Sequence, residues 1–271
     1  MNEVYVVGGH GYVGSRVVTE AGRGGVVVVS WAGDSRRGVP SLAWQEFLDH
    51  VESSGPCSVV WLLDGVKHAE PQRLDELLAV ASPEAHVVSV STCTVYGARH
   101  DDLCGENEPV QLLTTHARLK AGCEQTLITS GRSWCVLRLG ALYGIDDRGV
   151  RKDRIEKWVT QAAGHGTVAV PEPAHWRGWL HRDQAARALW RAASHRVTGL
   201  FNVASANLTF GQAARSAADL FGVSVESDGN PDPCSFQINA TAARTCGLLD
   251  ELAGEDLASA TASFVADNKL R

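Results

Sequence analysis

A glycine-rich turn near the start of the sequence is the first feature whose residue types and spacing suggest chemistry. It follows the apolar run Val4–Val7 and reads Gly8-Gly9-His10-Gly11-Tyr12-Val13-Gly14. Glycines at these three-residue intervals permit a tight turn, the close approach of a pyrophosphate and the close packing of a helix on a sheet. The unpaired N–H groups at the start of that helix attract anions. The pattern predicts a dinucleotide-binding turn, and the alternative is a turn that keeps this shape without a ligand.

A histidine and a lysine one helical turn apart form the second chemical pattern. His116 and Lys120 lie in a predicted helix over residues 116–130, and their spacing places both on one face. Imidazole titrates at about pH 6.5 and can therefore transfer protons without a large pKa shift. A charged Lys120 nearby would disfavour the imidazolium, so we expect a neutral His116 that accepts a proton or polarises a carbonyl. The alternatives are a donor that only orients the substrate and an ordinary helix residue.

Apolar β-branched runs alternate with helical segments through the first half of the chain. The predicted strands are Val4–Val7, Val26–Ser30, Ser58–Leu63, His86–Ser91 and Trp134–Leu139, and the predicted helices cover residues 12–21, 72–81 and 116–130. Continuous runs of this kind are typical of parallel strands buried on both faces. The alternation predicts a Rossmann-type, doubly wound α/β fold with helices on both faces of a parallel sheet.

The composition changes after Gly144, and the second half is predicted as a smaller unit. We expect a dinucleotide-binding domain over residues 1–145 and a small substrate-binding cap over residues 146–271, with segments near 179–205 returning to the first domain. Further strands are predicted at 167–170, 178–181 and 199–203, and helices at 155–163, 184–194, 210–221 and 256–266. Asp183 is placed to cap the second of these helices, and Thr209 the third.

Several segments, in this order, resemble those of the extended short-chain dehydrogenases/reductases, in particular the atypical members of the NAD-dependent epimerase/dehydratase type. They are the glycine turn, Ser91–Gly97, Glu106–Pro109, His116–Lys120, Arg138–Gly144, Arg177–His181 and Gly199–Val203. The resemblance covers about residues 2–225. It implies that Thr92 hydrogen-bonds the reacting oxygen and that Lys120 holds the nicotinamide ribose and tunes the proton-transfer group.

The same resemblance implies which residues line the site. The catalytic set is Thr92, His116 and Lys120. The residues expected at the cofactor are Gly8, His10, Gly11, Tyr12, Val13, Gly14, Ser30, Arg36, Leu63 and Lys120. The residues expected at the substrate are Asp64, Thr94, Ala141 and Arg177.

The chain departs from the family pattern at three of these positions. The family has tyrosine where this sequence has His116, so the proton transfer must be argued from imidazole chemistry. Asp64 follows a strand where the family commonly has His-Leu-Ala-Ala, and it is interpreted either as a second proton-transfer group or as a turn residue. Ala141 stands where nucleotide-sugar enzymes of the family tend to carry asparagine, which weakens the case for a standard nucleotide-sugar substrate.

The residue after the second strand bears on the choice of cofactor. Enzymes that use NAD usually have Asp or Glu there to bind the ribose hydroxyls. This chain has Ser30, followed by Arg36, and the pair could accept a 2′-phosphate. We expect NADP or NAD, with NADP slightly favoured; the alternative for Arg36 is an ordinary solvated loop.

Composition excludes several other classes of protein. The 271 residues carry 31 acidic and 25 basic side chains, a net charge of -6, so no nucleic-acid partner is expected. Seven cysteines without a Cys-x-x-Cys pair disfavour a disulfide framework, and the histidines lack a metal-ligand spacing, so no metal site is expected. No signal peptide or apolar stretch of about 18 residues is present, which favours a cytoplasmic protein without a membrane partner. Resemblance alone suggests a possible homodimer.

The favoured hypothesis is an NAD(P)-dependent oxidoreductase or epimerase. Its substrate would be a small polar carbonyl or hydroxyl compound, such as a modified sugar or a specialised metabolite. One alternative is a non-redox isomerase, lyase or cyclase on the same fold that uses His116 for proton transfer. Another is a non-catalytic NAD(P)-binding protein.

Overall fold

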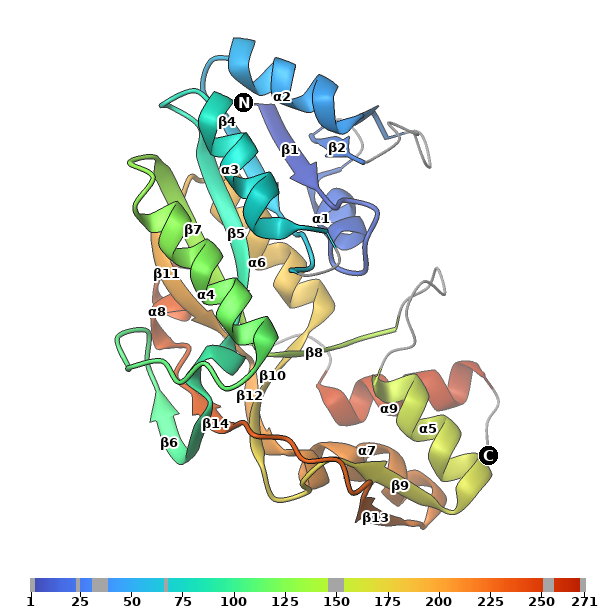
Figure 1. The fold of residues 1–271 in the computed structure, drawn as a ribbon. Helices are drawn as coiled ribbons and strands as arrows, with labels where there is room; N and C mark the ends of the chain where they lie inside the picture. Colours follow the sequence, from blue (N-terminus) through green and yellow to red (C-terminus); the bar gives the residue numbers. More distant parts are fainter. Residues whose placement is uncertain are drawn as a thin grey trace.

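The computed structural model describes residues 3–22, 25–30, 39–65, 68–145, 154–250 and 256–268, and a parallel sheet forms its centre (Figure 1). In spatial order the strands are β11 (Gly199–Val203), β7 (Ser133–Leu139), β5 (His86–Thr92), β4 (Cys57–Trp61), β1 (Glu3–Val7), β2 (Val27–Val29) and β3 (Ser41–Leu42). Every neighbouring pair is parallel. The chain winds outward from β1 in one direction and from β4 in the other, which confirms the predicted doubly wound fold.

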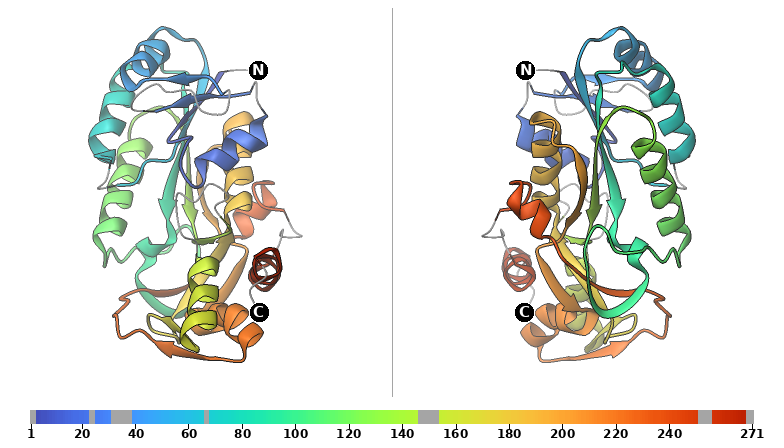
Figure 2. Two further views of the ribbon diagram at one scale, coloured as in Figure 1. Left: turned by 90° about the vertical axis from the view of Figure 1, so that its right-hand side faces the viewer. Right: turned by 90° about the vertical axis from the view of Figure 1, so that its left-hand side faces the viewer.

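Helices cover both faces of this sheet because the strands are apolar on both faces. In β1, Val4 and Val6 belong to one buried cluster, while Tyr5 and Val7 belong to another. The first face is covered by α1 (Gly14–Ala21) and α6 (Arg182–Ser194), and the second by α2 (Trp44–Ser53), α3 (Glu70–Val80) and α4 (Thr115–Ile128) (Figure 2). The alternation of side chains along a strand thus explains the three layers.

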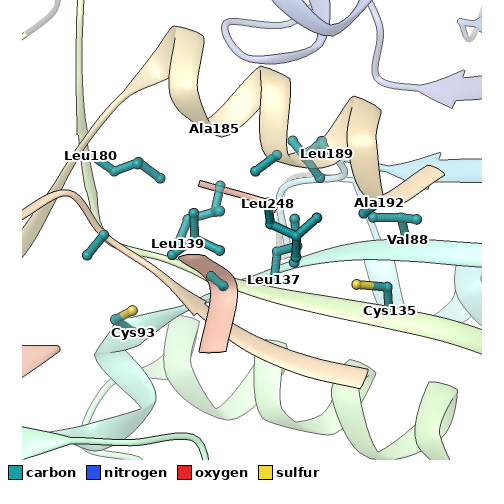
Figure 3. Close-up of a cluster of buried hydrophobic side chains, with 14 of the residues drawn as sticks. Val88, Cys93, Cys135, Leu137, Leu139, Leu180, Ala185, Leu189, Ala192 and Leu248 are labelled. Atoms are coloured by element: carbon teal, nitrogen blue, oxygen red, sulfur yellow. The ribbon is translucent and has the colours of Figure 1, made fainter. Parts of the chain in front are cut away.

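The core under α6 shows how the first face is filled. Ala185 and Leu189 of this helix pack over Val88 and Leu137 of the sheet, and Leu248 closes the cluster from the side (Figure 3). Alanines at the helix surface allow its backbone to approach the strands closely. This packing joins a helix from the second half of the chain to the large sheet, whose edge strand β11 also comes from that half.

The second half of the chain builds most of a smaller unit beyond the carboxyl ends of the strands (Figure 1). Its core includes Trp158, Trp179 and Phe210, whose rings pack edge to face. Its helices are α5 (Arg154–His165), α7 (Phe210–Phe221) and α9 (Leu257–Asp267), and its strands are β8 (Ala141–Tyr143), β9 (Thr167–Val170), β10 (Trp176–His181), β12 (Ala206–Thr209) and β13 (Ser224–Ser227). The remaining elements are η1 (Cys93–Tyr96), β6 (Ala98–Cys104), which pairs with β14 (Ser235–Ile238), and α8 (Thr241–Thr245).

The predicted caps were right at one helix and wrong at another. Thr209 accepts the Gln212 N–H at the start of α7, as expected. Asp183 does not cap α6: the cap is His181, whose ring nitrogen accepts the Asp183 N–H, and the helix begins at Arg182. Asp183 instead binds Arg16 of α1 with both carboxylate oxygens. A partner from a distant helix changed the role of this side chain.

Helix α2 was not predicted, although its signal is present. Helix α2 buries Trp44, Phe47, Leu48 and Val51, which follow the spacing of a single helical face. None of the helices in the described ranges combines the length and apolar character that a membrane span requires.

Candidate active site

The candidate site lies where the carboxyl ends of β1, β4 and β5 meet, at the edge of the sheet that faces the smaller unit (Figure 1). The glycine turn follows β1, Leu63 and Asp64 follow β4, and Thr92 ends β5. The strand order reverses between β1 and β4, and ligands of open α/β sheets bind at such a point.

The glycine turn has the shape that a dinucleotide pyrophosphate requires. Gly8 adopts a φ of +83°, which favours glycine, and its carbonyl accepts the Gly11 N–H at 2.9 Å. A Cβ at Gly14 would overlap the carbonyl oxygen of Gly8, so no side chain fits there. Helix α1 begins at this residue and carries no acidic side chain in its first turn. A compact turn that leads into a helix N-terminus without negative charge fits the phosphates of NAD or NADP.

Tyr12 joins this turn to the smaller unit. Its hydroxyl donates to the carbonyl of Gly144 at 2.6 Å, and the guanidinium of Arg182 lies 5.1 Å from the centre of its ring. The Arg16–Asp183 ion pair, with both bonds at 2.8 Å, joins α1 to α6 nearby. The tyrosine side chain therefore holds the turn in place from inside the protein.

The residues expected at the adenosine end of the cofactor are only partly described. Ser30 directly follows β2, and its N–H donates to the carbonyl of Leu42 at 3.0 Å. The ring of His10 lies 3.5 Å from the hydroxyl of Ser41, on the neighbouring strand. Arg36 lies outside the described residues, so the preference for NADP stays a prediction.

Two threonine hydroxyls lie together at the end of β5. Thr92 has an extended backbone and caps η1, where its Oγ1 accepts the N–H of Thr94 at 3.2 Å. The two side-chain oxygens are 2.9 Å apart, and both residues are half-buried. The geometry thus offers a pair of linked hydroxyls that can donate to a substrate oxygen.

Lys120 is held from three sides. Its Nζ donates to the carbonyl oxygens of Leu63 at 2.9 Å and Val90 at 3.0 Å, and to Oε1 of Glu70 at 2.8 Å. An ammonium group has three N–H donors, so each has an acceptor. The expected contact with a cofactor ribose would require one of these bonds to break.

His116 lies one turn before Lys120, in the first turn of α4. Thr114 caps this helix by accepting the N–H of Ala117 at 3.1 Å. The His116 side chain is exposed, yet surrounding protein removes part of its hydration. This desolvation, followed by the nearby Lys120 ammonium, lowers the pKa of His116 below its usual value, while Asp64 and Glu70 oppose the shift. The positive end of the helix acts in the same direction as the lysine. The resting imidazole is therefore neutral at pH 7.

Asp64 is exposed in the loop after β4. Its backbone N–H donates to Nδ1 of His68 at 3.2 Å, and its carbonyl accepts the His68 N–H at 3.1 Å. These bonds define a turn, as one of the two interpretations predicted. The carboxylate nevertheless acts on His116, because its charge raises the pKa of that imidazole.

Ala141 and Arg177, both predicted at the substrate, lie on the neighbouring strands β8 and β10. Ala141 begins β8 and is half-buried beside Trp179 of β10. Arg177 is buried, and its guanidinium binds the carbonyls of Trp176 and Cys234 and the carboxylate of Asp232. Its charge is therefore used inside the smaller unit, where it stabilises the segment before β14, rather than presented to a ligand.

One residue near the site, Glu70, was missed by sequence reasoning. Glu70 is fully buried at the start of α3, and its Oε1 accepts from both Lys120 and the indole N–H of Trp61 at 3.2 Å. In the sequence Glu70 precedes Pro71 and looks like an ordinary acidic residue in the first turn of a helix. No spacing rule connects it with a lysine 50 positions away.

A model of the NAD dependent epimerase/dehydratase family matches residues 68–204, which include Thr92, His116 and Lys120. No curated protein matches the sequence.

Solved structures extend the similarity to nearly the whole chain. A dTDP-glucose 4,6-dehydratase from Bacillus anthracis in complex with NAD is similar with a TM-score of 0.82 and 17% identity, over 99% of this chain and 98% of that one. A UDP-N-acetylglucosamine 4-epimerase from Bacillus cereus gives 0.76 and 19%, over 99% and 97%. An NAD dependent NDP-hexosamine 5,6-dehydratase of tunicamycin biosynthesis gives 0.80 and 16%, over 100% and 99%. At these identities the similarity shows a shared fold.

Proposed function

The chain belongs to the NAD dependent epimerase/dehydratase family, and on that premise we propose that it is an NAD(P)-dependent oxidoreductase or epimerase. Its substrate carries a secondary hydroxyl or a carbonyl group, as sugars and sugar-derived metabolites do. The similar solved enzymes named above act, by their names, on nucleotide-linked sugars. Ala141 gives this chain no side-chain amide at the corresponding position, so we propose a modified sugar or a comparable hydroxylated compound.

The proposal rests on α4, the end of β5 and the glycine turn after β1, which all reach the same end of the sheet. The bonds from Lys120 to the carbonyls of Leu63 and Val90 fix α4 against the ends of β4 and β5. His116 lies one turn earlier on the same helix, and this helix packs against β5 and η1, the two elements that meet at Thr92. The glycine turn of β1 opens on the same edge, next to β4.

The chemistry divides between the cofactor and these side chains. Bound NAD or NADP, held by the glycine turn, would accept or donate a hydride at nicotinamide C4. Thr92, supported by Thr94, donates a hydrogen bond to the reacting oxygen of the substrate. Neutral His116 accepts the hydroxyl proton in the oxidation direction and returns it in reduction. Lys120 acts on His116 through its charge, because a cation nearby favours the neutral ring.

The first test is direct binding of the cofactor, followed by turnover. Calorimetric titration with NAD, NADH, NADP and NADPH is expected to show micromolar binding of one oxidised and reduced pair. The protein is then incubated with deuterium-labelled reduced cofactor and a panel of keto sugars, free and nucleotide-linked. Deuterium in the product supports the proposal. An epimerase would return the substrate's own hydride and transfer no label, so turnover is also compared with and without NAD and NADP. Equal turnover in protein stripped of both cofactors would replace the proposal with non-redox proton transfer, and binding of none of the four cofactors would overturn it.

A further inference from the structure

The Glu70 carboxylate is the one buried acidic group that reaches the ammonium of Lys120 among the described residues. Both side chains are almost fully buried, at 0% and 4% exposure. Oε1 of Glu70 accepts from Lys120 and Trp61, while Oε2 has no hydrogen-bond partner and faces Gly65. Burying a charge is costly unless it is paired, so each of these two ions depends on the other.

The Glu70–Lys120 ion pair bears on proton transfer because Lys120 lies one helical turn after His116. Lys120 follows His116 by one turn of α4, and Glu70 comes from the adjacent helix α3. The ammonium alone would present a full positive charge to the imidazole. The carboxylate beside it reduces that charge to the weaker field of a dipole, because opposite charges at close range largely cancel at a distance.

We propose that Glu70 is a positioning residue of the active site, which holds the Lys120 ammonium between the ends of β4 and β5 and offsets its charge at His116. The inference rests on the proposed function only in naming His116 as the proton-transfer group. Without Glu70 the lysine would keep two carbonyl acceptors and lose its counter-ion.

Within the described ranges, further charged groups lie on the elements around His116, among them Arg118 on its own helix, which donates to the carbonyl of Leu112. Asp64 faces it from the loop after β4 and acts in the same direction as Glu70. The nearby end of β5 and η1 contribute Thr92, Thr94 and uncharged neighbours. Arg138 of β7 is bound to Glu124 on the following turn of α4, so that pair is internally neutral.

The test is an NMR titration of the His116 ring, which needs no substrate and stays decisive if turnover is never found. In Glu70→Gln, the Lys120 side chain keeps its two carbonyl acceptors and loses its counter-ion. The midpoint of His116 is then expected at lower pH than in the unchanged protein. Lys120→Met is expected to shift it upward. Glu76→Gln removes a carboxylate from the exposed side of the same helix, where it pairs with Arg73, and is expected to leave the midpoint unchanged.

The outcomes separate positioning from a merely structural role. A folded Glu70→Gln protein with the wild-type midpoint would overturn the proposal, as would a shift equal to that of Glu76→Gln. If Glu70→Gln does not fold, the double variant Glu70→Gln/Lys120→Met removes both charges together. Its midpoint is expected to be unchanged or higher, and a downward shift would contradict the proposal. Where turnover is found, the acid limb of kcat/KM should move with the NMR midpoint.

Discussion

Glu70 and Lys120 are 50 positions apart in the sequence, and their charged atoms lie 2.8 Å apart in the buried layer between α3, α4 and the sheet. This ion pair holds the lysine at the carboxyl ends of β4 and β5, the end of the sheet where the glycine turn and Thr92 also lie. Removing one partner of a buried pair typically costs about 3–5 kcal/mol, because the other charge stays buried without compensation. The pair is therefore a structural requirement as well as an electrostatic one.

Replacing His116 tests the centre of the proposed mechanism. His116→Ala is expected to lower kcat by roughly 10²- to 10⁴-fold, the usual contribution of a positioned acid or base, while the Kd of the cofactor changes little. His165→Ala, an exposed histidine at the end of α5, is the matched control and should retain full activity. Unchanged turnover of His116→Ala at saturating substrate would remove His116 from the reaction.

The pH profile follows from the direction of the His116 pKa shift. This pKa is lowered by desolvation and by Lys120, so the neutral ring that accepts a proton dominates at and above pH 7. In the oxidation direction kcat/KM should be flat there and fall as the pH drops through the lowered pKa. In the reduction direction the protonated ring is needed, so the dependence on pH is reversed. A limb at alkaline pH, where phenols titrate, would argue against imidazole.

Isosteric substitutions can distinguish the role of Thr92 from that of Thr94. Thr92→Val removes the hydroxyl proposed to hold the substrate oxygen, and kcat is expected to fall by roughly 10²-fold, as for the loss of one positioned donor. Thr92→Ser keeps the hydroxyl and should retain most of the activity. Thr94→Val removes only the supporting hydroxyl 2.9 Å away and should have a smaller effect. A larger loss in Thr94→Val would reverse the two roles.

A methyl group in the glycine turn tests the cofactor site. Gly14→Ala would push a Cβ into the carbonyl of Gly8, so the turn must open. We expect weaker dinucleotide binding by calorimetry and a stability loss of about 1–3 kcal/mol, typical of overpacking. Gly122→Ala in α4 meets no atom within 4 Å and is the control. It should bind normally and be more stable by up to about 1 kcal/mol. Normal binding by Gly14→Ala would contradict a pyrophosphate at this turn.

A carboxylate at position 30 tests the choice of cofactor. Ser30→Asp is expected to weaken NADP binding relative to NAD, because the new charge repels a 2′-phosphate and can accept from ribose hydroxyls. The measurement is the ratio of the two Kd values in both proteins. An unchanged ratio would place the adenosine ribose away from the end of β2.

The buried histidine of β5 makes stability depend on pH. Burial lowers the pKa of His86 to about 4, from an unfolded value of 6.5. Between these values the unfolded chain binds a proton that the native protein does not, so stability falls as the pH drops from 6.5 towards 4. The full effect is roughly 3 kcal/mol. Denaturant unfolding of His86→Gln should show a weaker fall over this window than the unchanged protein, and parallel curves would refute this origin.

The sequence was sufficient to predict the strands of the large sheet and the glycine turn. The apolar runs placed five strands of the large sheet to within one or two residues, because burial on both faces demands β-branched side chains throughout. The glycine turn was placed equally well, since only residues without a Cβ fit at Gly14. The spacing of His116 and Lys120 also sufficed to put both on one helix near the strand ends.

Only the tertiary structure decided how those side chains are used. Arg177 was expected at the substrate from the family resemblance, and Asp183 at a helix start from a local pattern. In the structure Arg177 pairs with Asp232, and Asp183 pairs with Arg16 instead of capping α6. Lys120 likewise received Glu70, a partner from another helix that no spacing rule could supply. Local rules determine backbone conformation because they depend on neighbours in the chain. The partners of buried charges depend on which distant elements the fold brings together, as Glu70 of α3 and Lys120 of α4 show.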